Sequence, residues 1–250
     1  MKAVALALGL ILLASYATSA ARTEATVPFR PGETLTYDVS WATFLAAGTV
    51  VMTVTGKKPS LDSMAYDIVA DARPAPLLAR LYSLYYKLDT LLDVYSLLPQ
   101  RGSLYTEEGN RHRLKTTRFD RTARKAFFED QSTTTVRADF PIAPSTLDAL
   151  SSLYVLRTVP LKAGLHVTMP VSHDGSNYKL AIDVAPAERI KTLLGEIAAW
   201  KVIPVVTDDK GQPVGKNLAM WISNDARRYP IKIHAELEVG SFDLVLREAR

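Results

Sequence analysis

The segment GETLTYDVSW, residues 32–41, decides the fold class of this chain. Its apolar residues stand at every second position from Leu35 to Trp41, with polar residues between them. This period of two places the apolar side chains on one face of an extended backbone, so the segment predicts a half-buried β-strand. The same alternation from Tyr178 to Val184 and from Ile231 to Val239 indicates a mainly β protein.

Further strands are expected at residues 49–55, 64–70, 86–94, 104–128, 165–171, 200–206, 218–222 and 242–246. Turn residues such as Asp174-Gly175 separate several of them, which is typical of antiparallel hairpins. We therefore expect about 10 to 13 strands with one or two short helices. An antiparallel barrel or closed sandwich is the economical arrangement, because closure hides the strand edges.

Two segments predict helices. After Pro76 the apolar residues fit both periods, and we expect a short helix that covers the core and changes to a strand near Tyr86. A second helix is expected with Ser145 as its N-cap and Asp148 as the capping-box acid three residues on. Its apolar stripe should lie on the sheet.

The first 21 residues are typical of a signal peptide. Lys2 is their first charge, an apolar run follows from Ala3 to Ala14, and Thr18-Ser19-Ala20 is an acceptable cleavage site. Cleavage after Ala20 or Ala21 predicts a periplasmic protein. An uncleaved membrane anchor is less favoured, because the apolar run is shorter than the about 20 residues that a spanning helix needs.

Composition fits one barrel-like domain, residues 22–250. The chain has no cysteine, which rules out disulfides and thiolate metal sites. A chain of about 230 residues can bury a sufficient core without such cross-links. The formal net charge of +4 is spread over 30 basic and 26 acidic residues, which is too mild to indicate nucleic acid as a partner.

Four segments resemble a family of exported bacterial proteins catalogued only as a domain of unknown function. They are Gly32-Glu33-x-Leu35-x-Tyr37-x-Val39-x-Trp41 with Ala47-Gly48, Leu147 to Arg157 with Pro160-Leu161 and Gly164, Gly195 to Pro204, and Met220 to Pro230. The resemblance covers nearly the whole mature chain. It implies a large antiparallel β-barrel or sandwich similar to that of some envelope lipoproteins, and it implies no established activity.

No pattern predicts catalysis, a cofactor or a metal site. The histidines are scattered without metal-ligand spacing, and no G-x-S-x-G elbow, phosphate loop or dinucleotide fingerprint occurs. The acidic residues that could form a glycosidase pair stand mostly beside turn residues, which turn chemistry explains; they are Glu107, Glu108, Asp208, Asp209 and Asp225. A carbohydrate-active hydrolase is therefore the third alternative for the function.

One stretch of charge is uneven, because seven basic residues between positions 111 and 125 are accompanied by a single acid, Asp120. Arg111, Arg113 and Lys115 would share one strand face, where they could bind phosphate or carboxylate groups. A solvated outer face is the alternative interpretation. Three residues of the segment after Pro76, namely Leu81, Tyr82 and Tyr85, could cover a pocket.

These features favour a non-catalytic, periplasmic binding module of the cell envelope for a lipid-like or glycan ligand. The alternative is a structural or interaction accessory of envelope assembly that docks an envelope protein. An apolar cavity larger than about 300 Å³ would favour the binding module. A packed interior with an exposed apolar patch would favour the accessory protein. No transmembrane segment is expected in the mature chain.

Overall fold

The computed structural model describes residues 22–42, 45–132, 134–237 and 240–250. The expected signal peptide and its cleavage site near Ala20 or Ala21 lie outside these residues. Within them the chain forms β1 (Thr34–Trp41), β2 (Leu45–Ser60), β3 (Ser63–Pro74), α1 (Pro76–Leu81), β4 (Leu84–Asp93), β5 (Pro99–Glu108), β6 (Arg111–Asp120), β7 (Lys125–Gln131), β8 (Thr135–Pro141), β9 (Leu147–Asp148), α2 (Ala149–Leu156), β10 (His166–His173), β11 (Ser176–Thr192), β12 (Gly195–Thr207), β13 (Pro213–Val214), β14 (Lys216–Ser223), β15 (Pro230–Leu237) and β16 (Gly240–Ala249).

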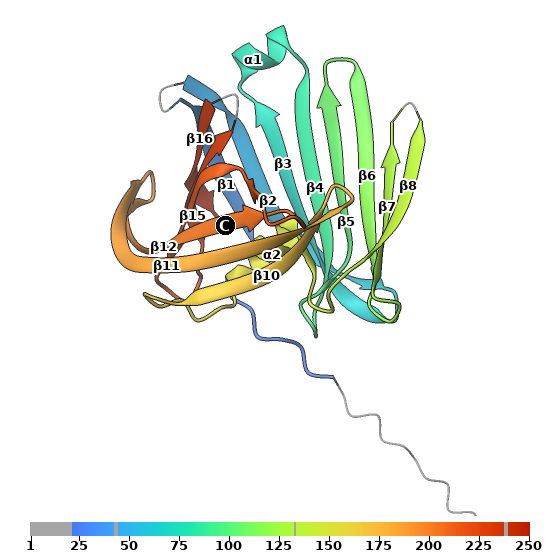
Figure 1. The fold of residues 1–250 in the computed structure, drawn as a ribbon. Helices are drawn as coiled ribbons and strands as arrows, with labels where there is room; N and C mark the ends of the chain where they lie inside the picture. Colours follow the sequence, from blue (N-terminus) through green and yellow to red (C-terminus); the bar gives the residue numbers. More distant parts are fainter. Residues whose placement is uncertain (1–21, 43–44, 133, 238–239) are drawn as a thin grey trace, which may run out of the picture.

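All the strands of the described residues belong to one sheet. Its order is β8-β7-β6-β5-β4-β3-β2-β1-β16-β15-β14-β12-β11-β10-β9, with β13 paired to β12. Most neighbours along the chain are thus neighbours in the sheet, whereas β8 and β9 lie at its two ends. Strand β1 also pairs with β16, so the first and the last strand meet. In Figure 1 the sheet curls around on itself, with β10 to β12 crossing in front of β3 to β5.

The prediction of a mainly β, barrel-like fold is confirmed, with two differences. Within the described residues the path of the sheet begins at β8 and ends at β9, so backbone pairing does not close it. The sheet has 16 strands, which exceeds the expected range. Two of them, β9 and β13, have two residues each, which is too short for an alternation to show. Strand β8 alternates apolar and polar residues but is exposed along most of its length.

Helix α2 lies inside the curved sheet (Figure 1). Its Leu150 and Tyr154 belong to the main core cluster, which also contains Tyr37 of β1. Leu156, at the end of the helix, belongs to a second cluster with Ile182 of β11. The prediction that this helix lies on the sheet is confirmed, and the helix joins both clusters.

The start of α2 differs from the expected one. Asp148 is the N-cap in place of Ser145: its carboxylate accepts the Ser151 N–H at 2.8 Å, and the Ser151 hydroxyl accepts the Asp148 N–H at 2.9 Å. Leu147 and Asp148 pair with β10 in a parallel ladder. This pairing holds the backbone extended as far as the cap, so the helix begins later than the sequence pattern suggests.

Helix α1 begins at Pro76 as expected, but it does not cover the core. Leu77 and Leu81 are 71% and 77% exposed, and none of its residues is buried. A helix of 6 residues makes fewer than two turns, which is too short for a stripe that anchors it to a core.

Trp41, which the alternation places in the core, is 39% exposed at the end of β1.

A buried ion pair connects three of the segments that carry the family resemblance. The side chains of Arg157 and Glu33 are 0% and 5% exposed, and two guanidinium nitrogens donate to the two carboxylate oxygens at 2.6 and 3.0 Å. The guanidinium also donates to the carbonyl oxygens of Arg227 and Arg228. Three aromatic rings surround it within 5.6 Å, those of Phe29, Tyr154 and Tyr229. These segments therefore meet at one buried charge.

Candidate functional site

The interior-facing side of β4 to β6, named here the inner wall, carries part of the candidate site. Leu88 of β4 is paired with the core residue Ala70 of β3 and, across β5, lies in the same row as Lys115 of β6. Side chains that lie opposite one another in a ladder share a face. Lys115 therefore faces the interior and, because strands have a period of two, so do Arg113 and Arg111.

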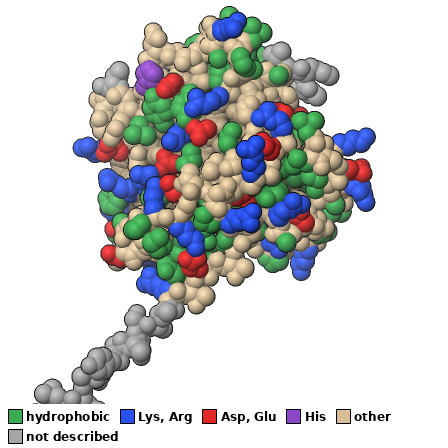
Figure 2. All heavy atoms as spheres, turned by 180° about the vertical axis from the view of Figure 1, so that it is seen from behind, with side chains coloured by type: hydrophobic (Ala, Val, Ile, Leu, Met, Phe, Trp, Pro, Cys, Tyr) green, Lys and Arg blue, Asp and Glu red, His purple; other side chains and the backbone are tan. Residues whose placement is uncertain are grey.

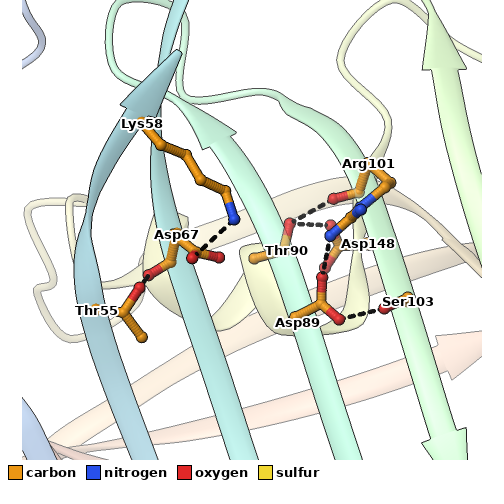
Figure 3. A network of polar contacts seen from close by, with 8 residues as sticks. All are labelled: Thr55, Lys58, Asp67, Asp89, Thr90, Arg101, Ser103 and Asp148. Carbon is orange, nitrogen blue, oxygen red and sulfur yellow. Dashed lines mark hydrogen bonds and ion pairs between the residues drawn. The ribbon is translucent and has the colours of Figure 1, made fainter. Parts of the chain in front are cut away.

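Asp148 fixes the start of α2 against this wall. Its Oδ2 accepts the Thr90 hydroxyl at 2.6 Å, while its Oδ1 accepts the Ser151 N–H. Gly102 permits the approach, since a Cβ there would lie 3.2 Å from the carboxyl carbon of Asp148. Figure 3 shows the hydrogen bond between Thr90 and Asp148 together with other polar contacts on β2 to β5. The helix that lines the site is thus held by a buried carboxylate.

Burial raises the pKa of Asp148 above its ordinary value of 3.8, although hydrogen bonds from Ser151 and Thr90 act in the opposite direction. The folded chain therefore keeps this proton at a pH where the unfolded chain has released it. The contribution of Asp148 to the free energy of unfolding is greatest below pH 3.8 and declines as the pH rises through the folded-state pKa.

Asp148→Asn is expected to remove this decline, because Asn keeps an acceptor for the Ser151 N–H and has no proton to release. Urea unfolding of both chains from acid to neutral pH should show the variant gaining stability relative to the wild type as the pH rises. Asp148→Ala, which also removes the cap, should cost about 1 kcal/mol. Parallel pH curves for the wild type and Asp148→Asn would contradict the raised pKa.

A small cavity of about 40 Å³ lies between the inner wall and α2. Lys115, which lines it, forms an ion pair with Asp174 at 2.6 Å. Asp174 lies in the turn between β10 and β11, so this pair joins β6 to the other end of the open sheet. Asn177 adds a second bridge, since its amide donates to the Pro141 carbonyl oxygen at the end of β8. Side chains thus span the gap that the backbone pairing leaves.

A second, apolar pocket of about 260 Å³ shares Ala149 and His173 with the small cavity. Its other lining residues come from α2 and from β10 to β13; they are Ser152, Val171, Tyr178, Leu180, Val206 and Val214. Val214 is 43% exposed, which places one side of the pocket at the protein surface. With few polar groups in its wall, the pocket suits an apolar group better than a sugar.

The three residues of the predicted anion patch share one face of β6 but differ in exposure and in their partners. The side chain of Lys115 is 17% exposed and is engaged by Asp174. Arg111 and Arg113 are exposed; in the part of the chain that the structure describes, no ion pair involves either guanidinium. Two of the three basic residues thus remain available to an anion.

The three residues of the expected pocket cover lie near one end of β4, two of them before the strand and one in it. Helix α1 stands at the upper edge of the sheet in Figure 1. Leu81, its last residue, and Tyr82, which follows it, are 77% and 55% exposed. Tyr85 lies on the face opposite Leu88: its hydroxyl donates to Asp71, and the Arg73 guanidinium lies 4.5 Å from its ring centre. Tyr85 is thus turned away from the interior, whereas Leu81 and Tyr82 are exposed before the strand begins.

The acidic residues considered for a catalytic pair include two that stabilise turns. Asp208 accepts the N–H groups of Lys210 and Gln212, and Asp225 accepts that of Arg227. No group of three His, Asp or Glu side chains in the described ranges is arranged to hold a metal ion. Neither α1 nor α2, the helices of that part of the chain, has the length and hydrophobicity to cross a bilayer.

The residues of the apolar pocket escape sequence reasoning. Val171, Leu180 and Val206 have the pattern of ordinary core strands, and nothing local marks them as lining a pocket. Asp148 has a signal, because a capping acid is recognisable before an apolar run. Its burial, however, depends on Thr90 and on the missing side chain at Gly102, which are distant in the sequence.

Fold and site together define a class of protein: a barrel-like antiparallel sheet with a helix inside it and an apolar pocket beside that helix. The chain belongs to the DUF3108 family of proteins of unknown function, whose family model matches residues 36–247. This confirms the resemblance to a domain of unknown function. No curated protein matches the sequence.

Among the solved structures that match this chain, one has a similar fold and two align less well. A β-barrel-like protein of the domain of unknown function DUF1849 from Brucella abortus has a TM-score of 0.54 and 11% identity, over 88% of this chain and 98% of that chain. An exported protein with a YmcC-like fold from Bacteroides fragilis has a TM-score of 0.35 and 12% identity, over 91% of this chain and all of its own. A protein described as a lipoprotein from Parabacteroides distasonis has a TM-score of 0.34 and 10% identity, with the same coverage. At these identities the likeness concerns the fold alone.

Proposed function

We propose that this protein is a non-catalytic binding module of the bacterial cell envelope, periplasmic after removal of its leader, that holds the apolar part of a lipid-like ligand. The observation that carries the proposal is the apolar pocket of about 260 Å³ beside α2. This volume does not reach the about 300 Å³ that we set above as favouring a binding module for a whole ligand. A pocket of this size accommodates a segment of a hydrocarbon chain, with the rest of the ligand outside it.

The neighbouring small cavity supports the proposal that the same ligand also has a polar headgroup. It shares Ala149 and His173 with the apolar pocket. Lys115, whose ammonium group pairs with Asp174, lines it together with Asp89 and Asp148. A ligand carboxylate or phosphate would compete with Asp174 for this ammonium group. Apolar and cationic groups thus lie side by side, which suits an amphiphile and disfavours a neutral glycan.

Val206→Phe tests the proposal by filling the apolar pocket. Titration with a dansyl-labelled fatty acid should show affinity about tenfold lower or worse, because the added ring occupies the space of the hydrocarbon chain. Val205→Phe is the matched control: Val205 is 46% exposed and is absent from the pocket lining, and adjacent strand residues point to opposite faces. Equal affinities of the two variants would refute the proposed site.

The natural ligand can be sought directly. Mature protein purified under mild conditions from native envelope should carry a lipid that mass spectrometry identifies. The same preparation of the Val206→Phe variant should carry less of it. A lipid retained equally by both chains would place its binding elsewhere.

A further inference from the structure

The rim around α1 carries an exposed apolar cluster. We name Leu77, Leu81, Tyr82 and Leu84 the rim cluster; their exposed fractions are 71%, 77%, 55% and 36%. Leu77 and Leu81 are four residues apart on α1, so they share one face of the helix. Large apolar side chains exposed together over residues 77–84 mark an interaction surface, whereas single exposed ones need no explanation.

The first residues of β6 lie beside the rim cluster. Leu84 is paired with Glu108 of β5, which is paired in turn with Arg111 of β6. Two strand spacings separate Leu84 from Arg111, or about 10 Å. Tyr82 lies against the turn between β5 and β6, since a Cβ on Gly109 would be 3.2 Å from its ring. Arg111 therefore stands within side-chain reach of the cluster.

Three guanidinium groups accompany the rim cluster: Arg80 is in the last turn of α1, and Arg111 and Arg113 are on β6. Over residues 22–42, 45–132, 134–237 and 240–250, none of the three takes part in an ion pair or a side-chain hydrogen bond. Glu108, the acid opposite Arg111, instead accepts the Tyr86 hydroxyl. The positive charges of the rim are thus available to an external anion.

We propose that this rim docks on an anionic lipid surface, with Leu77 and Leu81 inserted at the boundary of headgroups and acyl chains and the three arginines against lipid phosphates. Leucine, tyrosine and arginine on one surface are typical of proteins that lie in the membrane interface. At the top of Figure 2, the end where α1 lies in Figure 1, hydrophobic and basic side chains stand together. Elsewhere on that face, basic and acidic side chains are interspersed.

A lipid surface fits the rim better than a protein partner does. Arginine and aromatic residues are also enriched at protein interfaces, so the choice rests on the three guanidinium groups beside the cluster, which have no ion-pair partner among the described residues. Guanidinium groups bind phosphate through two parallel hydrogen bonds, and many phosphates are available on a membrane. The rim and the apolar pocket have no residue in common, so this inference stands without the proposed ligand site.

Co-sedimentation with vesicles tests the docking surface. Vesicles of phosphatidylcholine with phosphatidylglycerol should bind the mature wild-type chain, and those of phosphatidylcholine alone should bind it less. The variant L77S/L81S should bind the anionic vesicles about tenfold more weakly, because binding scales with the buried apolar area. R111S/R113S should show a comparable loss at low salt that shrinks as salt screens the charges.

Two matched control variants remove the same types of residue at positions away from the rim. L193S/L194S removes two leucines that are 75% and 47% exposed at the β11–β12 turn, and R30S/R118S removes two exposed arginines away from the rim. Both should bind vesicles like the wild type, and unchanged thermal unfolding should verify the fold of every variant. Equal binding of L77S/L81S and L193S/L194S would overturn the proposal.

A tryptophan at the rim gives an independent readout. In Tyr82→Trp, the added fluorescence should shift to the blue and be quenched by brominated lipid when anionic vesicles are added. Because the Val206→Phe pocket variant should bind vesicles normally, a failure of the pocket and a failure of the rim are distinguishable. Emission that does not change with vesicles, or a rim that captures an envelope protein while vesicles remain unbound, would refute lipid docking.

Discussion

Glu33→Ala is expected to destabilise the protein by about 3–5 kcal/mol, the loss typical of removing one partner from a buried ion pair. The substitution leaves the Arg157 guanidinium inside the core with no counter-charge, since the side chain of Arg157 is 0% exposed. Its hydrogen bonds to the carbonyl oxygens of Arg227 and Arg228 satisfy donors but do not balance the charge. Urea unfolding followed by circular dichroism measures the effect.

An exposed pair of the same chemistry is the control. Arg137 donates to Glu129 at 2.8 Å, but its side chain is 75% exposed, so Glu129→Ala should cost less than about 1 kcal/mol. Glu33→Gln, which keeps the volume and one acceptor, should fall between the two. A loss for Glu33→Ala no larger than that for Glu129→Ala would mean that the buried charge is compensated in another way.

Gly48→Ala should cost about 3 kcal/mol, at the upper end of the range for overpacking, or should prevent folding. Gly48 of β2 is paired with Pro74 of β3, and a Cβ there would lie 2.2 Å from the backbone carbonyl oxygen of Arg73. Because the obstacle is backbone, no change of rotamer relieves the clash, and β2 and β3 must separate. Thermal and urea unfolding report the loss.

Gly56→Ala on the same strand is the matched control for Gly48→Ala. No atom lies within 4 Å of a Cβ at Gly56, so alanine should be tolerated there and could add up to about 1 kcal/mol by restricting the unfolded chain. The same substitution in one strand thus has opposite expected signs. Equal stabilities of the two variants would show that β3 moves aside at little cost.

Local patterns predicted the strands and one helix well, because each depends on neighbouring residues. The alternation in residues 32–41 becomes β1, the turn at Asp174-Gly175 joins two antiparallel strands, and Pro76 begins a helix. The expected cap at Ser145 was wrong. Pairing of Leu147 with Val171 keeps that segment extended, and no local pattern contains such a partner.

The candidate site was less predictable than the fold. A two-residue period put Arg111, Arg113 and Lys115 on one face, and the ladder places them there. Which of the three is available to an anion depends on Asp174, whose carboxylate binds Lys115 although it lies 59 residues away from it in the sequence. The apolar pocket depends on strands and a helix that register and curvature bring together.

The sequence by itself determined the β class and the family, because the period of side chains along a strand and the motif residues are properties of short segments. Only the tertiary structure decided that Glu33 pairs with Arg157, 124 residues away, that the sheet stays open between β8 and β9, and that an apolar pocket lies beside α2. The physical reason is that alternation selects the buried face of a strand, whereas strand register, bulges and turn lengths select the distant residues that this face meets.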